Sequence, residues 1–345
     1  MPCYNPQLAF PLDYLTRDGK QAYRFIRCDR GVPYDVKERI FVSHHKSEVL
    51  RIPCNKCIGC RLKYAREWAT RCMFELQYHK DAWFVTLTYN DQHVPKSYYP
   101  DPSTGEAIPV MTLSRRDLQL LLKRLRRSHP DCNIRYYACG EYGPTTWRPH
   151  YHMILYGLPL DDLQVRSQQV DGQITAWESP TLSAVWSTRP FGNYSPLLDA
   201  IGDVQLAPVT WSTCAYTARY VIKKQLGEDG RNFYETYHLQ PPFTAMSLKP
   251  AIGKQYLLDH PDIYDWDSVP LPVGDGVKDV YPPRYFDRLY DIDHPEEMAQ
   301  IKEMRRFASE AAQQAQLRQT SLTYYDLLAQ QERSQLRRQQ KEFDI

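Results

Sequence analysis

The order of secondary-structure elements predicted from the sequence indicates an α+β protein, with a ferredoxin-like or RRM-like antiparallel sheet and helices packed on one face. Three observations lead to this fold class. Two successive strands are joined by a short turn that is rich in Thr and Pro. A further strand precedes them and is separated from them by an amphipathic helix. A helix, a strand and another helix come after them, which completes the order β-α-β-β-α-β-α.

The N-terminal segment is polar and rich in turns, and the first clearly predicted elements follow it. Residues 61–80 carry apolar side chains near helical spacing and predict a helix. The apolar, β-branched run at residues 82–89 predicts a buried strand. Residues 90–110 are rich in Pro, Asp, Ser and Gly, so we expect a loop there.

The helix at residues 114–130 has the clearest boundaries. Ser114 and Asp117 resemble a capping box, leucines at helical spacing form an apolar stripe, and Pro130 ends the helix. The other face is basic, because residues 111–135 hold seven Lys and Arg against two acidic residues. Such a face suits phosphate groups, although a solvated helix surface is the commoner explanation.

The remaining elements complete the sheet and its helices. In order, they are a strand at 133–143, the strand that holds His150 and His152, a helix at 178–187, a strand at 203–209 and a helix at 212–225. From Pro295 onward, a polar pattern rich in Ala and Gln predicts a long helix. We expect three parts: a Cys-rich N-terminal segment with its helix (1–80), a central domain (81–260) and a C-terminal extension (261–345), largely helical from 295.

Composition limits the class of protein. The chain has 345 residues, of which 42% are apolar and 24% charged, and this length allows more than one domain. No N-terminal apolar signal and no apolar run near the length of a membrane span is present, so we expect a cytoplasmic protein. The nine cysteines are then expected to be metal ligands or free thiols rather than disulfides.

His150 and His152 alternate in an apolar strand, so both imidazoles leave the same face of the sheet. Two half-buried histidines bonded to neighbours are the plain alternative, but a pair in register favours a bound metal ion. A hairpin that is symmetric about its Thr-Thr turn places Glu141 opposite His150 and Cys139 opposite His152. Two imidazoles and a carboxylate leave coordination positions open for water and a substrate oxygen, as catalytic sites do. These ligands are compatible with Mg²⁺ or Mn²⁺.

Tyr216 and Tyr220 lie four residues apart in a predicted helix and share one face. Each has a cation three residues later, Arg219 and Lys223 respectively. Taken alone, the helix is better explained as an amphipathic helix with two ordinary core tyrosines. A phenol with a pKa of about 10 is a poor nucleophile at neutral pH, so a nearby cation and a metal-bound phosphate would help it to react. Together with the histidines, the helix indicates metal-assisted attack of Tyr on a phosphodiester.

Cys54, Cys57 and Cys60 have the spacing C-x-x-C-x-x-C. A structural Zn²⁺ would need a fourth ligand, and Cys28, Cys72 or Cys3 could supply it. Free buried thiols are an equally open reading, and an iron–sulfur cluster is less expected because no cysteine follows four residues after Cys60.

Several of these segments resemble a known family. "GEYG…RPHYHMILYG", followed by "YTARYVIKK", resembles the HUH endonucleases, and "FVTLTY" is similar to the strand that precedes their histidines. "PCNKCIGCRLKYAREWATRC" and "MSLKPAIGKQY" resemble the replication initiators of the microviruses, in particular the gokushovirus branch. The matching segments span roughly residues 50 to 256.

The resemblance implies an HUH fold and rolling-circle replication of a single-stranded-DNA phage in the cytoplasm of its bacterial host. The protein would bind single-stranded or supercoiled origin DNA, nick one strand, and remain attached through a 5′-phosphotyrosine. Host helicase and DNA polymerase would extend the free 3′-OH, and the second tyrosine would later release and circularise the unit-length strand.

The resemblance also assigns residues. It implies that His150, His152 and Glu141 are metal ligands, that Tyr216 and Tyr220 are alternating nucleophiles, and that Lys223 helps them electrostatically. DNA phosphate contacts are expected from the basic helix, from residues 61–71 and from other cations near the site. The individual residues are Arg115, Arg116, Lys123, Arg124, Arg127, Arg148, Arg219 and Lys224.

Three other functions compete with this interpretation. A zinc-dependent nucleobase deaminase is rejected, because its P-C-x-x-C motif follows H-x-E, whereas here the cysteines come first and His152 replaces the Glu. A non-catalytic, zinc-containing nucleic-acid-binding module would leave the Tyr–Lys helix unexplained. A transposase or relaxase with the same chemistry stays open, although the cysteine cluster favours the phage initiator.

Overall fold

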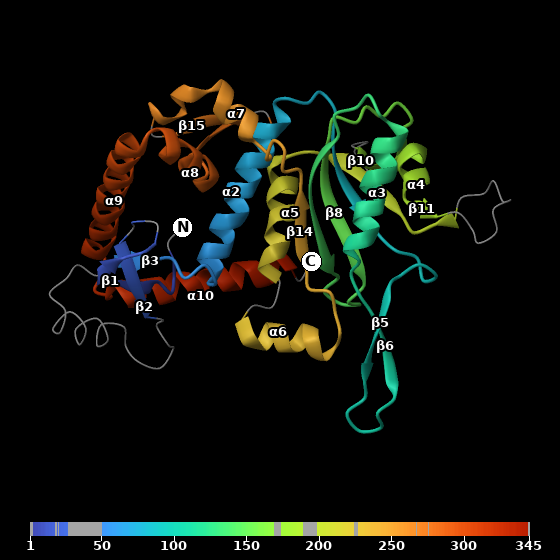
Figure 1. The fold of residues 1–345 in the computed structure, drawn as a ribbon, viewed down its shortest axis with the longest axis horizontal. Coiled ribbons are helices and arrows are strands. Elements are labelled where there is room, and N and C mark those ends of the chain that lie inside the picture. Colours follow the sequence, from blue (N-terminus) through green and yellow to red (C-terminus); the bar gives the residue numbers. More distant parts are fainter. Residues whose placement is uncertain are drawn as a thin grey trace. The chain divides into compact units, whose positions relative to one another are not determined.

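The computed structural model describes residues 3–17, 19, 21–26, 50–168, 174–188, 199–223, 227–266, 268–274 and 276–343 (Figure 1). The chain divides into two compact units, which are described separately. One is Ala65–Leu289, and the other joins Met1–Tyr64 to Tyr290–Ile345. The expected division into three parts stays a prediction.

A seven-stranded sheet forms the centre of the unit Ala65–Leu289, and all its strand pairs are antiparallel. In spatial order, its strands are β14 (Phe243–Met246), β7 (Arg135–Tyr142), β8 (Pro149–Tyr156), β4 (Ala82–Leu87), β13 (Val204–Pro208), β10 (Ile174–Glu178) and β9 (Gln164–Gln168). The prediction of an α+β protein with a large antiparallel sheet is therefore confirmed.

One face of the sheet packs against α3 (Arg115–Ser128) and α4 (Pro180–Val185). Alternate residues of β8, such as Met153 and Leu155, join the leucine stripe of α3 in a single core. Ser114 caps α3, because its side chain accepts a hydrogen bond from the backbone N–H of Asp117 at 3.2 Å. The predicted start of this helix is thus confirmed.

The opposite face packs against α2 (Ile58–Leu76) and α5 (Trp211–Lys223), so the prediction of helices on one face only is wrong (Figure 1). Trp68 of α2 stacks on Tyr137 of β7 with ring centroids 4.6 Å apart, and the Tyr156 hydroxyl donates to the Cys72 carbonyl. The physical reason is the composition of β7 and β8. Both are buried along almost their whole length, so both faces of these central strands need a covering layer.

The structure contains further elements that the sequence did not indicate. The expected loop at 90–110 instead holds a hairpin, because its tyrosine- and valine-bearing segments pair with each other. The elements that the sequence did not indicate include β5 (Lys96–Pro100), β6 (Ala107–Met111), β11 (Ser187–Thr188), β12 (Asp199–Ala200), α6 (Gly227–Thr236), α7 (Lys254–Asp259), a 3₁₀ turn (Pro261–Tyr264), β15 (Val269–Val273), β16 (Gly276–Val280) and α8 (Arg284–Asp293).

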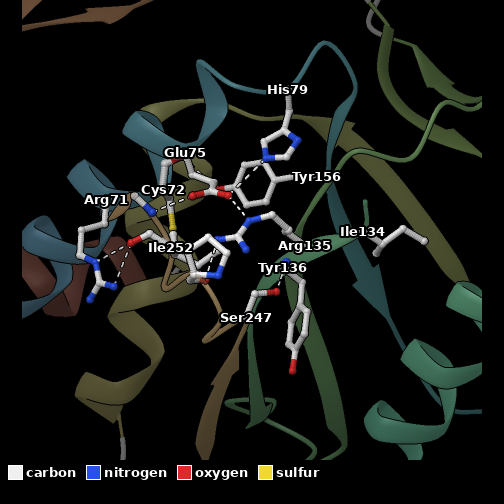
Figure 2. A network of polar contacts seen from close by, with 12 residues as sticks. Arg71, Cys72, Glu75, His79, Ile134, Arg135, Tyr136, Tyr156, Ser247 and Ile252 are labelled. Carbon is white, nitrogen blue, oxygen red and sulfur yellow. Dashed lines mark hydrogen bonds and ion pairs between the residues drawn. The ribbon is translucent and has the colours of Figure 1, made fainter. Parts of the chain in front are cut away.

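Buried Glu75 of α2 is the centre of an ionic network (Figure 2). Its carboxylate accepts hydrogen bonds from the Arg135 guanidinium and from the Gly253 backbone N–H, the latter at 2.7 Å, and lies 3.2 Å from His79 Nε2. Burial alone would raise the pKa of Glu75, but hydrogen bonds from His79, Arg135 and Gly253 outweigh it and lower that pKa to about 2. The network joins α2 to β7, and β7 goes on to carry Glu141.

The same region holds the segment between β14 and α7 in place. Arg71 donates from Nε and from a terminal nitrogen to the Ile252 carbonyl, at 3.0 and 2.9 Å (Figure 2). Its guanidinium also lies 4.0 Å from the Trp68 ring centroid and 4.1 Å from that of Tyr285. Arg71 is therefore committed to this internal packing, although residues 61–71 were expected to contact DNA.

The second unit contains a three-stranded sheet and two long helices. The sheet has the order β2 (Gln21–Ile26), β1 (Gln7–Leu15), β3 (Leu50–Ile52). The C-terminal helical region consists of α9 (Pro295–Arg318) and α10 (Tyr324–Phe343) rather than one long helix. Thr323 begins the second helix, since its hydroxyl accepts from the backbone N–H of Asp326. Among the helices described, none has the length and apolar character needed to cross a lipid bilayer.

Candidate metal and nucleophile site

Strand pairing brings three candidate ligands together on one face of the large sheet. Glu141 of β7 is paired directly with His150 of β8, and Cys139 is paired with His152. On the other side of β8, Thr86 of β4 is paired with His152. The predicted hairpin register is therefore confirmed, and the period of two along each strand directs these side chains to the face that α5 covers.

The carboxylate of Glu141 lies between the two imidazoles. Its Oε1 atom is 2.6 Å from His150 Nε2 and 3.3 Å from His152 Nε2, and the three ligand atoms lie within 4.8 Å of one another. Glu141 is only 2% exposed and His152 6%. Burial alone would raise the pKa of Glu141, but hydrogen bonds from His150 and His152 outweigh it and hold that pKa below its usual value.

Both imidazoles are oriented by an oxygen at their second nitrogen. His150 Nδ1 lies 3.2 Å from the Arg148 carbonyl, and His152 Nδ1 lies 3.0 Å from the Thr86 hydroxyl. Phe84 stacks on His152 with ring centroids 5.4 Å apart. Partners of this kind fix the rings of metal-binding histidines, so that both Nε2 atoms face the carboxylate. Two nitrogens and one carboxylate oxygen make a donor set that fits a divalent cation.

Thr86 and Phe84 were missed as individual site residues. The available signal was their position in "FVTLTY", where they alternate onto one face of a strand. The sequence alone does not show that β4 lies next to β8, so it cannot show which of the two faces of β4 meets the histidines.

Tyr216 of α5 lies over the same cluster. Its ring centroid is 5.1 Å from that of His152 and 6.1 Å from that of Phe84, in edge-to-face geometry. Burial raises the pKa of the Tyr216 phenol to about 12, with a further contribution from the negative charge of Glu141, while Arg219 acts in the opposite direction. The phenol is thus placed beside the candidate ligands but is not activated by the protein alone.

The other predicted nucleophile and its helper are described only in part. Tyr220 and Lys223 belong to α5, which ends at Lys223, but their side chains lie outside the described part of the chain. Lys224 lies outside the described residues altogether. The roles expected for these three residues stay predictions.

The basic helix α3 lies on the far face of the sheet from the histidines. Its leucine stripe packs against Met153 and Leu155, whereas His150 and His152 point the other way. Its exposed cations are Arg115, Arg116, Lys123, Arg126 and Arg127. These cations and the Glu141 cluster therefore lie on opposite faces of the sheet.

Three of the expected DNA contacts already have protein partners. Arg115 lies over the Phe243 ring, 4.3 Å from its centroid. Arg124 donates to the carbonyls of Val185 and Ser187, at 3.3 and 2.9 Å, which ties α3 to the end of α4.

Arg148 donates to the Tyr89 carbonyl at 3.2 and 2.8 Å and to Asp91 at 2.7 Å, which fixes the start of β8. Its own carbonyl oxygen is the partner of His150, so its position bears on the cluster directly.

Comparison with known proteins finds replication-associated proteins. The family model described as replication-associated protein ORF2/G2P matches residues 82–225, which include the histidine strand and the whole of α5. The replication-associated protein ORF2 of Spiroplasma virus 4 is 34% identical over 261 residues, which are 74% of this chain and 72% of that protein. The replication-associated protein VP4 of Bdellovibrio phage phiMH2K is 30% identical over 78% of this chain and 77% of its own length.

A shorter match covers about half of the chain. The replication-associated protein ORF4 of Chlamydia phage 1 is 26% identical over 50% of this chain and 38% of its own length. No solved structure matches the chain. The two longer relatives cover about three quarters of the chain at 30% identity or more. The chain therefore belongs to the family of microvirus replication-associated proteins.

Proposed function

We propose that this protein initiates rolling-circle replication of a single-stranded-DNA phage by cutting one strand of the origin, as the HUH endonucleases do. The observation that carries the proposal is the position of Tyr216, whose ring lies 5.1 Å from His152 in a cluster that also contains Glu141 and His150. Family membership supports a role in replication, and the side chains on this face of the sheet suggest the chemistry.

In this proposal, one set of residues holds a cation and a different residue attacks the DNA. Glu141, His150 and His152 would hold Mg²⁺ or Mn²⁺, which would polarise a phosphoryl oxygen of the DNA and offset negative charge near the phenol. The oxygen of Tyr216 attacks the phosphorus, and the bond from phosphorus to the 3′ oxygen breaks. The phenol loses its proton and the leaving oxygen gains one, which leaves a free 3′-OH and a 5′-phosphotyrosine.

The phosphotyrosine keeps the number of phosphoester bonds unchanged, so rejoining requires no ATP. A second tyrosine four residues later on the same helix face, Tyr220, would cut the regenerated origin after one round of synthesis. The 3′-OH released in that step would then attack the first phosphotyrosine and close the circle. Arg219 would favour the phenolate of Tyr216, because its positive charge acts against the rise in the pKa of that phenol.

A covalent-adduct assay tests the proposal. Protein is mixed with Mn²⁺ or Mg²⁺ and end-labelled, single-stranded oligonucleotides that tile the phage origin, and the products are separated on a denaturing gel. We expect a metal-dependent adduct with the wild type and none with His150→Ala. Tyr216→Phe and Tyr220→Phe should each lose one of the two transfer steps, and the double variant should lose cleavage altogether.

Tyr237→Phe is the matched control, because Tyr237 and Tyr216 are equally exposed at 37% and Tyr237 belongs to no part of the cluster. It should behave as the wild type does. Cleavage by the double variant at the wild-type rate would contradict the tyrosine mechanism. Binding of the oligonucleotides without any adduct would favour the non-catalytic binding module instead.

A further inference from the structure

We propose that Cys3, Cys54, Cys57 and Cys60 bind one structural Zn²⁺ as four thiolates, and that this ion fastens the N-terminal strand and the C-terminal helix α10 of their unit together. The four sulfur atoms lie within 4.8 Å of one another. The spacing of the last three cysteines indicated such a site but left the fourth ligand open, and the structure brings Cys3 to it. Cys28, a competing candidate, lies outside the described residues, and Cys72 is not in the cluster.

Strand pairing explains why Cys3 reaches the others. In the antiparallel pair of β1 and β3, Gln7 lies opposite Ile52. Continuing this register by a few residues beyond both strands carries Cys3 to the turn that begins at Cys54. The chain segment before β1 and the segment after β3 therefore meet at the sulfur cluster.

The distances fit a single tetrahedral ion. A Zn–S bond of about 2.3 Å requires sulfur atoms about 3.8 Å apart. The Cys3 and Cys57 sulfurs are 3.9 Å apart, and those of Cys54 and Cys60 are 4.0 Å apart. A disulfide would need a separation of about 2.05 Å, and all four cysteines are free. Several irons with bridging sulfides would need more widely spaced ligands than one ion does.

Backbone N–H groups point at the sulfurs and favour their deprotonated form. Cys54 donates to the Cys3 sulfur at 3.2 Å, and Tyr4 donates to that of Cys57 at 3.3 Å. Lys56 and Cys57 both donate to the Cys54 sulfur, at 3.4 and 3.2 Å. A cluster of neutral thiols would gain little from so many converging donors, whereas thiolates would.

Local backbone geometry supplies these donors. Asn55 adopts a left-handed conformation with φ of 58°, which turns the chain tightly between Cys54 and Cys57. The helix α2 begins at Ile58, so Cys60 lies in its first turn, where the helix dipole favours negative charge.

The cluster is also the place where α10 packs. Leu328 of that helix is buried with Tyr4 and Cys57, and Tyr324 and Tyr325 pack around the same group. The Arg51 guanidinium lies 5.5 Å from the Tyr324 ring centroid. An ion bound here would fix the chain segments against which α10 packs. Such an ion would add stability to a unit whose described apolar cluster is small.

The test uses the full-length protein loaded with Zn²⁺ or Co²⁺. We expect one zinc per chain that is released by a thiol-blocking mercurial, and for Co²⁺ the intense charge-transfer bands of a tetrahedral thiolate site. Cys3→Ser should lose most of this bound metal. Cys132→Ser, which changes a half-buried cysteine outside the cluster, should retain it. His152→Ala should also retain it, so the result is independent of the proposed nicking site.

A second measurement covers the case in which Cys3→Ser does not fold. Hydrogen exchange of the wild-type protein is compared before and after zinc removal by a chelator. We expect faster exchange in peptides from β1 and from α10, and unchanged exchange in peptides from β7 and β8. Absence of thiolate bands, full metal binding by Cys3→Ser, or unchanged exchange in α10 after zinc removal would each overturn the proposal.

Discussion

Replacing Glu75 by Gln removes the charge at the centre of the network that joins α2, β7 and the loop before α7. The pKa of this carboxyl falls from an ordinary 4.5 to about 2 in the folded protein. At about 1.4 kcal/mol per pH unit, this difference corresponds to roughly 3 kcal/mol of stability. A similar loss, about 3–5 kcal/mol, is typical when one partner of a buried ion pair is removed, and Arg135 would be left buried without its carboxylate.

The sign of the pH dependence follows from the lowered pKa. The ionised carboxylate stabilises the fold fully above about pH 4.5, and the contribution is lost as the pH falls from there towards 2. The gap in unfolding free energy between the wild type and Glu75→Gln should therefore be about 3 kcal/mol at pH 7 and should narrow as the pH falls below 4.5.

Urea unfolding followed by tryptophan fluorescence measures this gap for the structural unit that contains Glu75. All seven tryptophans lie within Ala65–Leu289, so their fluorescence does not report on the other unit. Glu67→Gln is the control, because Glu67 is 24% exposed and lies 3.6 Å from Arg284 in a partly solvated pair, which is worth about 1 kcal/mol or less. The stabilising role of the Glu75 carboxylate is refuted if Glu75→Gln lowers the unfolding free energy by no more than this control does. It is also refuted if that loss is the same at pH 7 and pH 3.

Three further predictions concern the site and its surroundings. Thr86→Val removes the oxygen that orients His152, and it should raise the Mn²⁺ concentration for half-maximal nicking by about tenfold or more; an unchanged Mn²⁺ titration would argue against that role. Arg124→Ala should lower the unfolding free energy by about 2 kcal/mol, since Arg124 is bonded to backbone carbonyls. Its affinity for single-stranded DNA, measured by fluorescence anisotropy, should be no lower than that of Arg127→Ala. A loss of DNA affinity in Arg124→Ala that Arg127→Ala does not show would contradict this prediction. Arg219→Gln should slow nicking at pH 7 and recover part of the rate at higher pH, because Arg219 opposes the rise in the pKa of Tyr216; an identical pH–rate profile would exclude this effect.

The local parts of the fold could be predicted because short-range patterns determine them. Alternation along β8 gave the shared face of His150 and His152, and the short turn gave the pairing of Glu141 with His150. The cap at Ser114 likewise depends only on residues three positions apart. These are interactions between residues that are near in sequence, so the sequence pattern contains them.

The contacts that could not be predicted join segments that are distant in sequence. The covering of both faces of the sheet depends on where α2 and α5 return, and residue periodicity does not specify this. Arg124 looked like one of several cations on a solvated helix, but the chain brings two carbonyl groups to it from α4 and β11. Cys3 could not be preferred over Cys28 or Cys72, because the choice depends on the register of β1 with β3.

The central claim is that a tyrosine on α5, beside the Glu141 cluster, becomes joined to DNA. Peptide mapping by mass spectrometry tests it most directly: protein that has reacted with an origin oligonucleotide in Mn²⁺ is digested with a nuclease and trypsin, and the residue that carries the remaining nucleotide phosphate is identified. The account predicts that phosphate on Tyr216 or Tyr220, and its absence when His152 is replaced by Ala. A phosphate on a residue outside α5, or cleaved DNA with no modified peptide, would contradict it.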